Sequence, residues 1–428
     1  DAFRQKLIDN EPQQLNAVIE FAKKAYRRPL IDTDVAQIRD LYASLRVQEL
    51  AHDEALRLTL ARVLVSPAFL YRLEKPGAGT KAGPVSDDEL ANRLSYFLWS
   101  SAPDAELLSL AAAGKLHDPD VVAAQARRML KDAKIRRMAT EFGCHWLHIH
   151  DFDHLDEKSE RHFPTFNALR GAMYEESILV LTDMLQNDRS VVSLVDGDST
   201  FLNEELARHY GIPGIMGREW RRVENVRQYS RGSILSLATT LSKQSGASRT
   251  SPILRGNWLS EVVLGEKLPR PPKNVPVLSE TVPEGLTERQ LIARHTSDRA
   301  CAKCHLRFDP FGFALEGFDG IGRLRTTDAA GLPIDTKTVL FDGTSVDGLA
   351  DLKHYLGTTR RQAFVGQFQR KLLGYALGRS VQLSDEPLLA EIQKQLNQND
   401  NHVAIVVEAI VRSPQFREIR GRNRVSDE

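Results

Sequence analysis

The sequence predicts a mainly α-helical, multi-helical protein with short irregular or β excursions, and three observations support this. Apolar residues recur at helical spacing, as in Val18, Ile19, Ala22 and Ala25. Proline, glycine and capping residues separate such stretches from one another. Hydrophobic residues form 42% of the 428 positions, which is enough to bury a sizeable core in roughly two or three domains.

The first half of the chain is expected to be almost wholly helical. A helical stretch over 15–45 is broken at Arg28-Pro29-Leu30, and a second over 51–73 ends near Ser66-Pro67. Ser86 and Glu89 fit a capping box that opens the next helix. Further helices are expected at 104–114, 119–131, 133–148, 165–187 and 202–210.

After Tyr210 the pattern changes. Loops with short strands are expected at Trp220–Val226 and in the Ser/Thr-rich stretch 236–251. A helix is expected at Leu254–Leu264, and the Pro-rich segment 268–276 is expected to be extended. Residues 331–343 suggest a small hairpin or irregular excursion. Helices are then expected at 346–356, 359–377, 385–397 and 402–412. We therefore expect helical domains over 1–75 and 76–230, a third domain over 231–330 that includes the Pro-rich linker, and a C-terminal helical domain over 331–428.

Charge and hydropathy exclude two classes of partner. The 57 basic and 57 acidic residues balance to a formal charge of +0, which argues against bulk nucleic-acid or anionic-lipid binding. No run of about 18 apolar residues exists, so no transmembrane segment is expected.

The most specific motif is Cys301-Ala302-Lys303-Cys304-His305. The spacing Cys-x-x-Cys-His marks covalent attachment of one c-type haem, with His305 as axial ligand. Two thiols three residues apart on a helical turn can each reach a vinyl group of one porphyrin edge. The third domain is therefore expected to be a cytochrome-c-like haem domain.

Two alternative chemistries fit the motif less well. A thioredoxin-like pair requires a preceding strand, whereas Leu286–Ala300 is charged and helix-like. A zinc site requires a second pair of ligands, which Cys144 and His145 could supply only by a long-range coincidence.

Haem attachment of this kind takes place outside the cytoplasm, so we expect a periplasmic or extracellular protein. No signal peptide is visible at Asp1-Ala2-Phe3-Arg4, so we expect the chain to be a mature or trimmed form.

Aromatic and basic residues near the motif are candidate haem contacts. Four phenylalanines, including Phe308 and Phe313, follow within eleven residues and suit a porphyrin face. Arg249 and Arg255 flank a Ser-Pro helix start that suits an anion such as a haem propionate, although a capped helix with surface arginines accounts for it equally well. Arg323 is a third candidate.

The sixth iron ligand stays open on the sequence alone. All five methionines lie upstream of the motif, so a histidine is the stronger candidate. His295, six residues before Cys301, is the first choice, with His354 and His402 as alternatives; a vacant position would indicate oxygen or peroxide chemistry. The cluster His145–His154 is a possible metal site, but a polar surface turn is the commoner setting for such histidines.

The segment from His295 through Cys301–His305 to Arg323 resembles the planctomycete-cytochrome-like family. These are large exported bacterial proteins made of consecutive domains of unknown function. Matching motifs elsewhere cover nearly the whole chain: Tyr26–Leu30, Arg93–Ser100, Phe201–Glu204, His209–Gly211, Arg249–Gly256 and Leu372–Arg379. The resemblance implies haem binding, export and a further N-terminal region or larger assembly, but no reaction. It favours His295, with His209 second, over His354 and His402, and it matches nothing in the His145–His154 cluster.

Three functions follow. The leading hypothesis is an exported mono-haem c-type cytochrome that passes electrons to a redox partner protein. The second is a haem peroxidase or oxidase acting on an extracellular organic substrate, with Tyr210 or Arg255 near bound peroxide. The third is a polysaccharide- or partner-binding scaffold with accessory haem.

Overall fold

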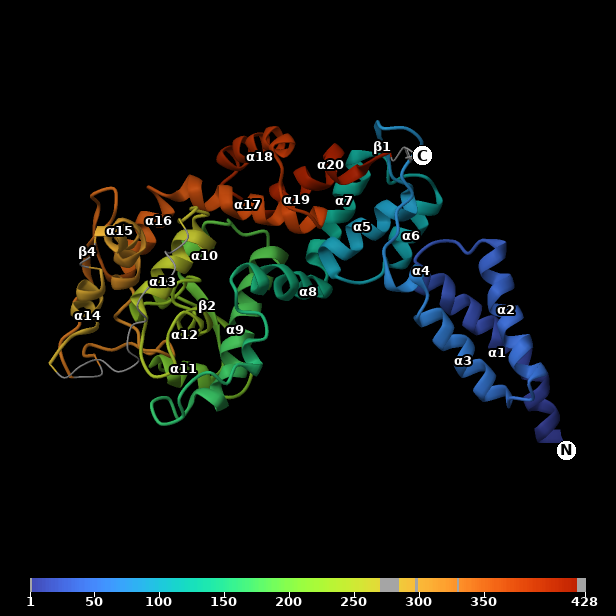
Figure 1. The fold of residues 1–428 in the computed structure, drawn as a ribbon, viewed down its shortest axis with the longest axis horizontal. Helices are drawn as coiled ribbons and strands as arrows, with labels where there is room; N and C mark the ends of the chain where they lie inside the picture. Colours follow the sequence, from blue (N-terminus) through green and yellow to red (C-terminus); the bar gives the residue numbers. More distant parts are fainter. Residues whose placement is uncertain (1, 270–284, 297–298, 329–330, 422–428) are drawn as a thin grey trace. The chain divides into compact units, whose positions relative to one another are not determined.

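The protein is mainly helical with short strands, as the sequence predicts (Figure 1). The structure, a computed structural model, describes residues 2–269, 285–296, 299–328 and 331–421. The chain folds as two compact units. Residues 1–129 and 410–428 form one, and residues 130–409 form the other. The domain boundaries expected from the sequence stay predictions.

The first unit begins with helices that pack together through a shared apolar cluster, followed by a second group of helices. A cluster of apolar side chains from the first three helices, including Leu15, Ile19, Ile38 and Val63, is buried. The elements of this unit are α1 (Ala2–Tyr26), α2 (Asp32–Val47), α3 (His52–Leu64), α4 (Pro67–Leu70), β1 (Ala82–Pro84), α5 (Asp87–Trp99), α6 (Ala105–Ala112), α20 (Pro414–Arg417) and β6 (Glu418–Arg420), with most of α7 (Pro119–Lys131).

Local signals in the sequence define the ends of several of these helices. Ser86 and Glu89 form the expected capping box at the start of α5, since the Ser86 hydroxyl accepts from the Glu89 amide and the Glu89 carboxylate accepts from the Ser86 amide. The stretch 51–73 is two helices rather than one, because Ser66 ends α3 and caps α4 before Pro67. Antiparallel pairing of β1 with β6 joins the two chain segments of this unit.

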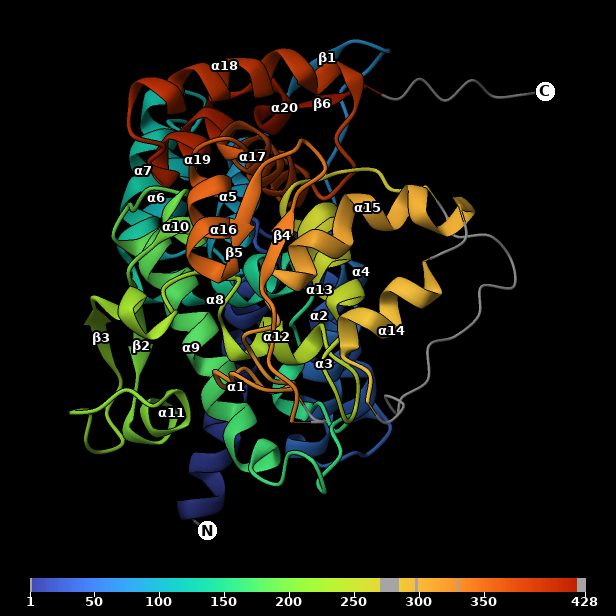
Figure 2. The same ribbon diagram turned by 90° about the vertical axis from the view of Figure 1, so that its left-hand side faces the viewer.

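The second unit contains the motif and most of the remaining helices (Figure 2). Its earlier elements are α8 (Arg136–Met138), α9 (Phe166–Gln186), α10 (Ser193–Asp196), β2 (Ser199–Leu202), α11 (Glu204–Tyr210), β3 (Arg221–Glu224), α12 (Ala238–Lys243) and α13 (Pro252–Trp258). Its later elements are α14 (Glu288–His295), α15 (Arg299–Phe313), β4 (Lys337–Val339), β5 (Ser345–Asp347), α16 (Gly348–Gly357), α17 (Arg361–Leu377), α18 (Glu386–Gln398) and most of α19 (Val403–Arg412). Short 3₁₀ turns lie at 133–135, 152–154, 226–229 and 383–385, and π-helical turns at 139–144 and 259–263.

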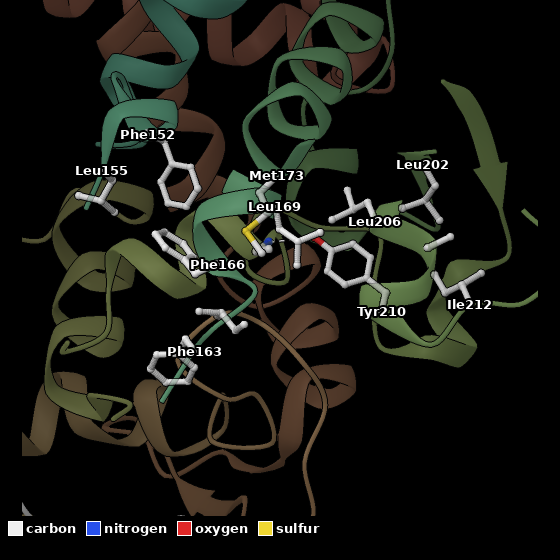
Figure 3. Close-up of a cluster of buried hydrophobic side chains, with 13 residues drawn as sticks. Phe152, Leu155, Phe163, Phe166, Leu169, Met173, Leu202, Leu206, Tyr210 and Ile212 are labelled. Carbon is white, nitrogen blue, oxygen red and sulfur yellow. Dashed lines mark hydrogen bonds between the residues drawn. The ribbon is translucent and has the colours of Figure 1, made fainter. Parts of the chain in front are cut away.

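A buried cluster around α9 forms one core of this unit (Figure 3). It gathers Phe152, Phe166 and Met173 with Leu206 and Tyr210 of α11. Antiparallel pairing of β2 with β3 lies beside it, so the strand expected near Trp220–Val226 is present.

The Ser/Thr-rich stretch 236–251 differs from expectation, because it contains the helix α12 rather than strands. Hydroxyl groups would be expected to compete with a helix backbone, yet Thr240 donates to the carbonyls of Ile234 and Leu237 and Ser245 donates to that of Leu241. All of α12 up to Ser242 is buried, so packing overrides the weak intrinsic propensity. The extended segment expected over 268–276 lies largely outside the described residues.

Candidate haem-attachment site

The motif Cys301–His305 lies near the start of α15, as the sequence predicts for a helical turn. Positions 301, 304 and 305 are related by three and four residues, so they share one face of the helix. Both cysteines are free and half-buried. Two thiols and an imidazole therefore lie together on one helical surface.

A close crossing of α13 and α15 holds the motif helix in place. A Cβ atom built on Gly312 would lie 1.9 Å from the carbonyl oxygen of Pro252, and one built on Gly256 would lie 1.9 Å from that of Phe308. Only residues without a side chain allow the two backbones to approach so closely. Figure 2 shows α13 and α15 side by side with α14 next to them.

The ring of His305 is fixed through one of its two nitrogens. Its Nδ1 lies 3.0 Å from each carboxylate oxygen of Asp309, one helical turn further on. A carboxylate only accepts hydrogen bonds, so Nδ1 carries the proton and Nε2 keeps its lone pair available to bind a metal. The side chains are 14% exposed for His305 and 7% for Asp309. Burial raises the pKa of Asp309, and the hydrogen bond from His305 opposes this rise.

The structure brings His295 to His305. His295 is the last residue of α14, and its ring centroid lies 5.6 Å from that of His305, with the two planes nearly perpendicular at 77°. The other histidine favoured by the sequence, His209, is held elsewhere: its Nε2 lies 2.9 Å from the carbonyl oxygen of Ile321. Burial lowers the pKa of His209 to about 4. His354 is exposed on α16, and His402 bonds to the backbone of Asp188.

The two predicted phenylalanines differ in position. Phe308 is buried and its ring centroid lies 4.8 Å from that of His305, so it packs beside the candidate ligand. Phe313, at the end of α15, lies under the guanidinium of Arg289 from α14, 4.5 Å from its ring centroid. Arg289 also pairs with Asp335. Phe313 thus helps to join α14 to α15.

The three predicted arginines do not form one cluster. Arg249 pairs with Glu288 at the start of α14. Arg255 is 1% exposed and donates to the carbonyls of Leu315, Phe318 and Asp319. Arg323 pairs with Asp319 at 2.9 Å and is 43% exposed. That these arginines bind haem propionates stays a prediction. The contacts of Arg255 show a structural role as well, because they hold the turn that follows α15.

Sequence reasoning did not single out several residues of this site. Asp309 was recognisable, because a carboxylate four residues after a histidine faces it on a helix. Glu288, Glu316 and Arg325 were not: Glu316 pairs with Arg255 and Arg325 in contacts that only the fold creates. Burial raises the pKa of Glu288 to about 7, against the opposing effect of Arg249.

Two cavities lie elsewhere in this unit. One, of about 290 Å³, adjoins α15 and is lined by Arg307, Phe311, Phe341 and Tyr355. The other, of about 420 Å³, lies between α9 and β2. Neither is lined by the motif residues.

The histidine cluster at 145–154 does not form a metal site. In the described part of the chain, no group of three or more His, Cys, Asp or Glu residues is arranged to hold a metal ion, and this includes 145–154. There, His145 and His150 instead stack on each other with ring centroids 4.1 Å apart.

Comparison with known families places the chain. Four models, each described as a protein of unknown function, match in succession: DUF1595 over residues 14–74, DUF1592 over 85–212, DUF1588 over 231–328 and DUF1585 over 342–416. The third contains the Cys-x-x-Cys-His motif and is named as a cytochrome-like domain of this series. Together these are the domains of the planctomycete cytochrome-like proteins, and the chain belongs to that family.

No curated protein and no solved structure matches the chain significantly. Among the helices of the described residues, none is both long enough and apolar enough to cross a bilayer.

Proposed function

We propose that the chain is an exported mono-haem c-type cytochrome that transfers electrons. Cys301 and Cys304 would hold the haem covalently, and His305 and His295 would supply nitrogen ligands to its iron. The attachment is made outside the cytoplasm, in the periplasm or beyond it, and electrons pass to or from a redox partner protein.

One observation carries this proposal: Asp309 occupies Nδ1 of His305 and leaves Nε2 free on the helix face that holds both thiols. A histidine that ligates a metal commonly donates its other ring nitrogen in this way, which fixes the tautomer and the ring orientation. The residues present therefore fit the group that the motif indicates.

The chemistry of attachment requires no further reactant. Each thiol adds across one vinyl group, with the sulfur bonded to one carbon and the proton delivered to the other, so no atoms are lost. The bound haem supplies a one-electron iron couple. Asp309 would orient the His305 ring, and Phe308 would pack against that ring and limit its contact with water.

The position of His295 supports a second histidine ligand for the iron, which would favour electron transfer over reaction at an open iron. Its ring is close to that of His305, on a separate helix whose capping box of Thr287 and Gln290 defines where it begins. The peroxidase hypothesis required Tyr210 or Arg255 beside bound peroxide. The Tyr210 hydroxyl instead donates to buried Glu176, and Arg255 is engaged with backbone carbonyls. Neither side chain favours the enzymatic alternative.

The axial assignment is tested by absorption spectra of the exported full chain. We expect the wild type to be low-spin, and H295A to keep covalent haem but become high-spin and bind cyanide readily. H354A, which changes an exposed histidine of α16, is the matched control and should resemble the wild type. A high-spin wild type, or an unchanged low-spin spectrum in H295A, would contradict the assignment. An unchanged spectrum on substitution of His305 would exclude that residue as the proximal ligand.

A further inference from the structure

We propose that Asp309 is a positioning residue that makes His305 a stronger electron donor and so lowers the reduction potential of the iron. This inference rests on the proposed function, because it concerns the ligand of the attached haem. Asp309 would then determine how strongly the ferric state of the iron is favoured over the ferrous state.

The carboxylate of Asp309 is aimed at Nδ1 of His305. Nδ1 of His305 lies 3.0 Å from both oxygens of Asp309, so the proton is shared with the whole carboxylate rather than with a single lone pair. The four-residue spacing on one helix fixes this arrangement locally. Rotation of the ring about its Cβ–Cγ bond would break both contacts, so the free Nε2 is held in one direction.

The charge of Asp309 is not neutralised by a basic side chain. The other buried acids close to the motif helix face arginines: Glu288 pairs with Arg249, and Glu316 with Arg255 and Arg325. In the described part of the chain, no Lys or Arg side chain pairs with Asp309, whose carboxylate contacts the His305 ring and also interacts electrostatically with His295. Its negative charge therefore acts on the imidazole and, through it, on the metal.

Burial makes this effect substantial. Both partners are shielded from water, and the ring of Phe308 packs against the His305 ring. Charge interactions and hydrogen bonds are stronger where the local dielectric is low. A carboxylate acceptor draws the Nδ1 proton toward itself, which raises electron density at Nε2 and the basicity of the ligand.

A more basic ligand with a nearby negative charge favours ferric over ferrous iron, since the ferric ion carries one more positive charge. Loss of an outer partner of a ligating histidine typically changes metal affinity by 10- to 100-fold. If the loss of Asp309 weakens histidine binding to ferric iron about tenfold more than to ferrous iron, the midpoint potential rises by about 59 mV for one electron.

The test is a redox titration of holoprotein from an exporting, haem-attaching host. We expect the midpoint potential of D309N to rise by the equivalent of about tenfold or more in the ferric-to-ferrous ratio. E391Q, which removes an exposed carboxylate from α18, is the charge control and should leave the midpoint unchanged. A D309N holoprotein with an unchanged midpoint would overturn the inference, as would an equal rise in E391Q.

A measurement on the wild type keeps the inference testable if D309N does not mature. Resonance Raman spectra of the ferrous protein, just after photolysis of its carbon monoxide adduct, report the iron–histidine stretching frequency. We expect the frequency typical of a histidine bonded to a carboxylate. The lower frequency typical of a carbonyl-bonded histidine would overturn the role of Asp309. If the wild type carries no haem at all, it is the proposed function that fails.

Discussion

Two glycines determine how closely the motif helix packs against its neighbour. Gly256 and Gly312 face the opposite backbone, where any Cβ atom would overlap a carbonyl oxygen. The Cys-x-x-Cys-His turn and Asp309 both belong to α15. The packing of α15 against α13 therefore determines the position of the whole site.

We expect G312A to lower the free energy of unfolding by about 3 kcal/mol or more, because the helices must separate to admit the methyl group. The matched control is G171A, at an exposed position of α9 where a Cβ meets nothing within 4 Å. That change should be neutral or stabilise by roughly 0.5–1 kcal/mol, since alanine is the better helix former. Urea unfolding monitored by circular dichroism measures both. Equal changes in the free energy of unfolding for G312A and G171A would contradict the close approach of α13 and α15.

Arg255 illustrates which contacts a local sequence pattern can indicate and which depend on the fold. Its unusual position beside a Ser-Pro helix start was visible, and a bound anion was one interpretation. The structure fills that helix start with the hydroxyl of Ser251, which accepts from the Leu254 amide. The carbonyls that Arg255 holds lie at least 60 residues away in the chain, and no local pattern reveals such contacts.

Buried Glu176 links α9 to β2 and α11 directly, and to α12 through Tyr210. It accepts from Thr200 of β2 and from the hydroxyl of Tyr210 of α11, each at 2.5 Å, and Tyr210 also accepts from the first amide of α12. The guanidinium of Arg231 lies 3.6 Å from the Tyr210 ring centroid. Burial raises the pKa of Glu176 to about 7, although these hydrogen bonds and Arg231 act against the rise.

This raised pKa predicts a pH dependence of stability. Below the ordinary pKa of glutamate, the carboxyl is protonated in both folded and unfolded chains and contributes no pH dependence. As pH rises toward 7, the unfolded chain loses its proton first, so Glu176 increasingly destabilises the fold, by about 3 kcal/mol once the pH exceeds 7. Melting temperatures at pH 5 and pH 8 measure this. We expect E176Q to lose less stability than the wild type between these values; parallel losses would show that Glu176 does not titrate in this way.

Helices were the most predictable elements, because apolar periodicity and caps are local signals. The helices of the C-terminal third begin and end close to their expected positions, and the hairpin expected at 331–343 lies slightly later, as β4 and β5. Tertiary packing decided the exceptions. Helix α12 forms from a Ser/Thr-rich stretch because it is buried, and the helix expected at 133–148 is interrupted by 3₁₀ and π-helical turns.

Considering the protein in full, the candidate site belongs to one of its two compact units. The motif, Asp309 and His295 all lie within residues 130–409. The sequence identified the cysteines and the histidines because their spacing carries the chemistry. It could not show that His295 meets His305, since that contact depends on how α14 packs against α15, which no local residue pattern determines.

The third cysteine provides an internal control for covalent attachment. Cys144 is buried, and burial raises the pKa of its thiol to about 12, so it is protonated and unreactive under physiological conditions. Its neighbour Tyr174 also interacts with it. Thioether formation should therefore be confined to the motif.

Denaturing intact-mass spectrometry of the full chain, after expression in a host that exports it and attaches c-type haem, tests the central claim most directly. We expect a mass increase of one haem in the wild type and in C144A, and no covalent increase when both Cys301 and Cys304 are replaced by alanine. A wild-type mass equal to that of the bare polypeptide, from material that is colourless before denaturation, would contradict the account.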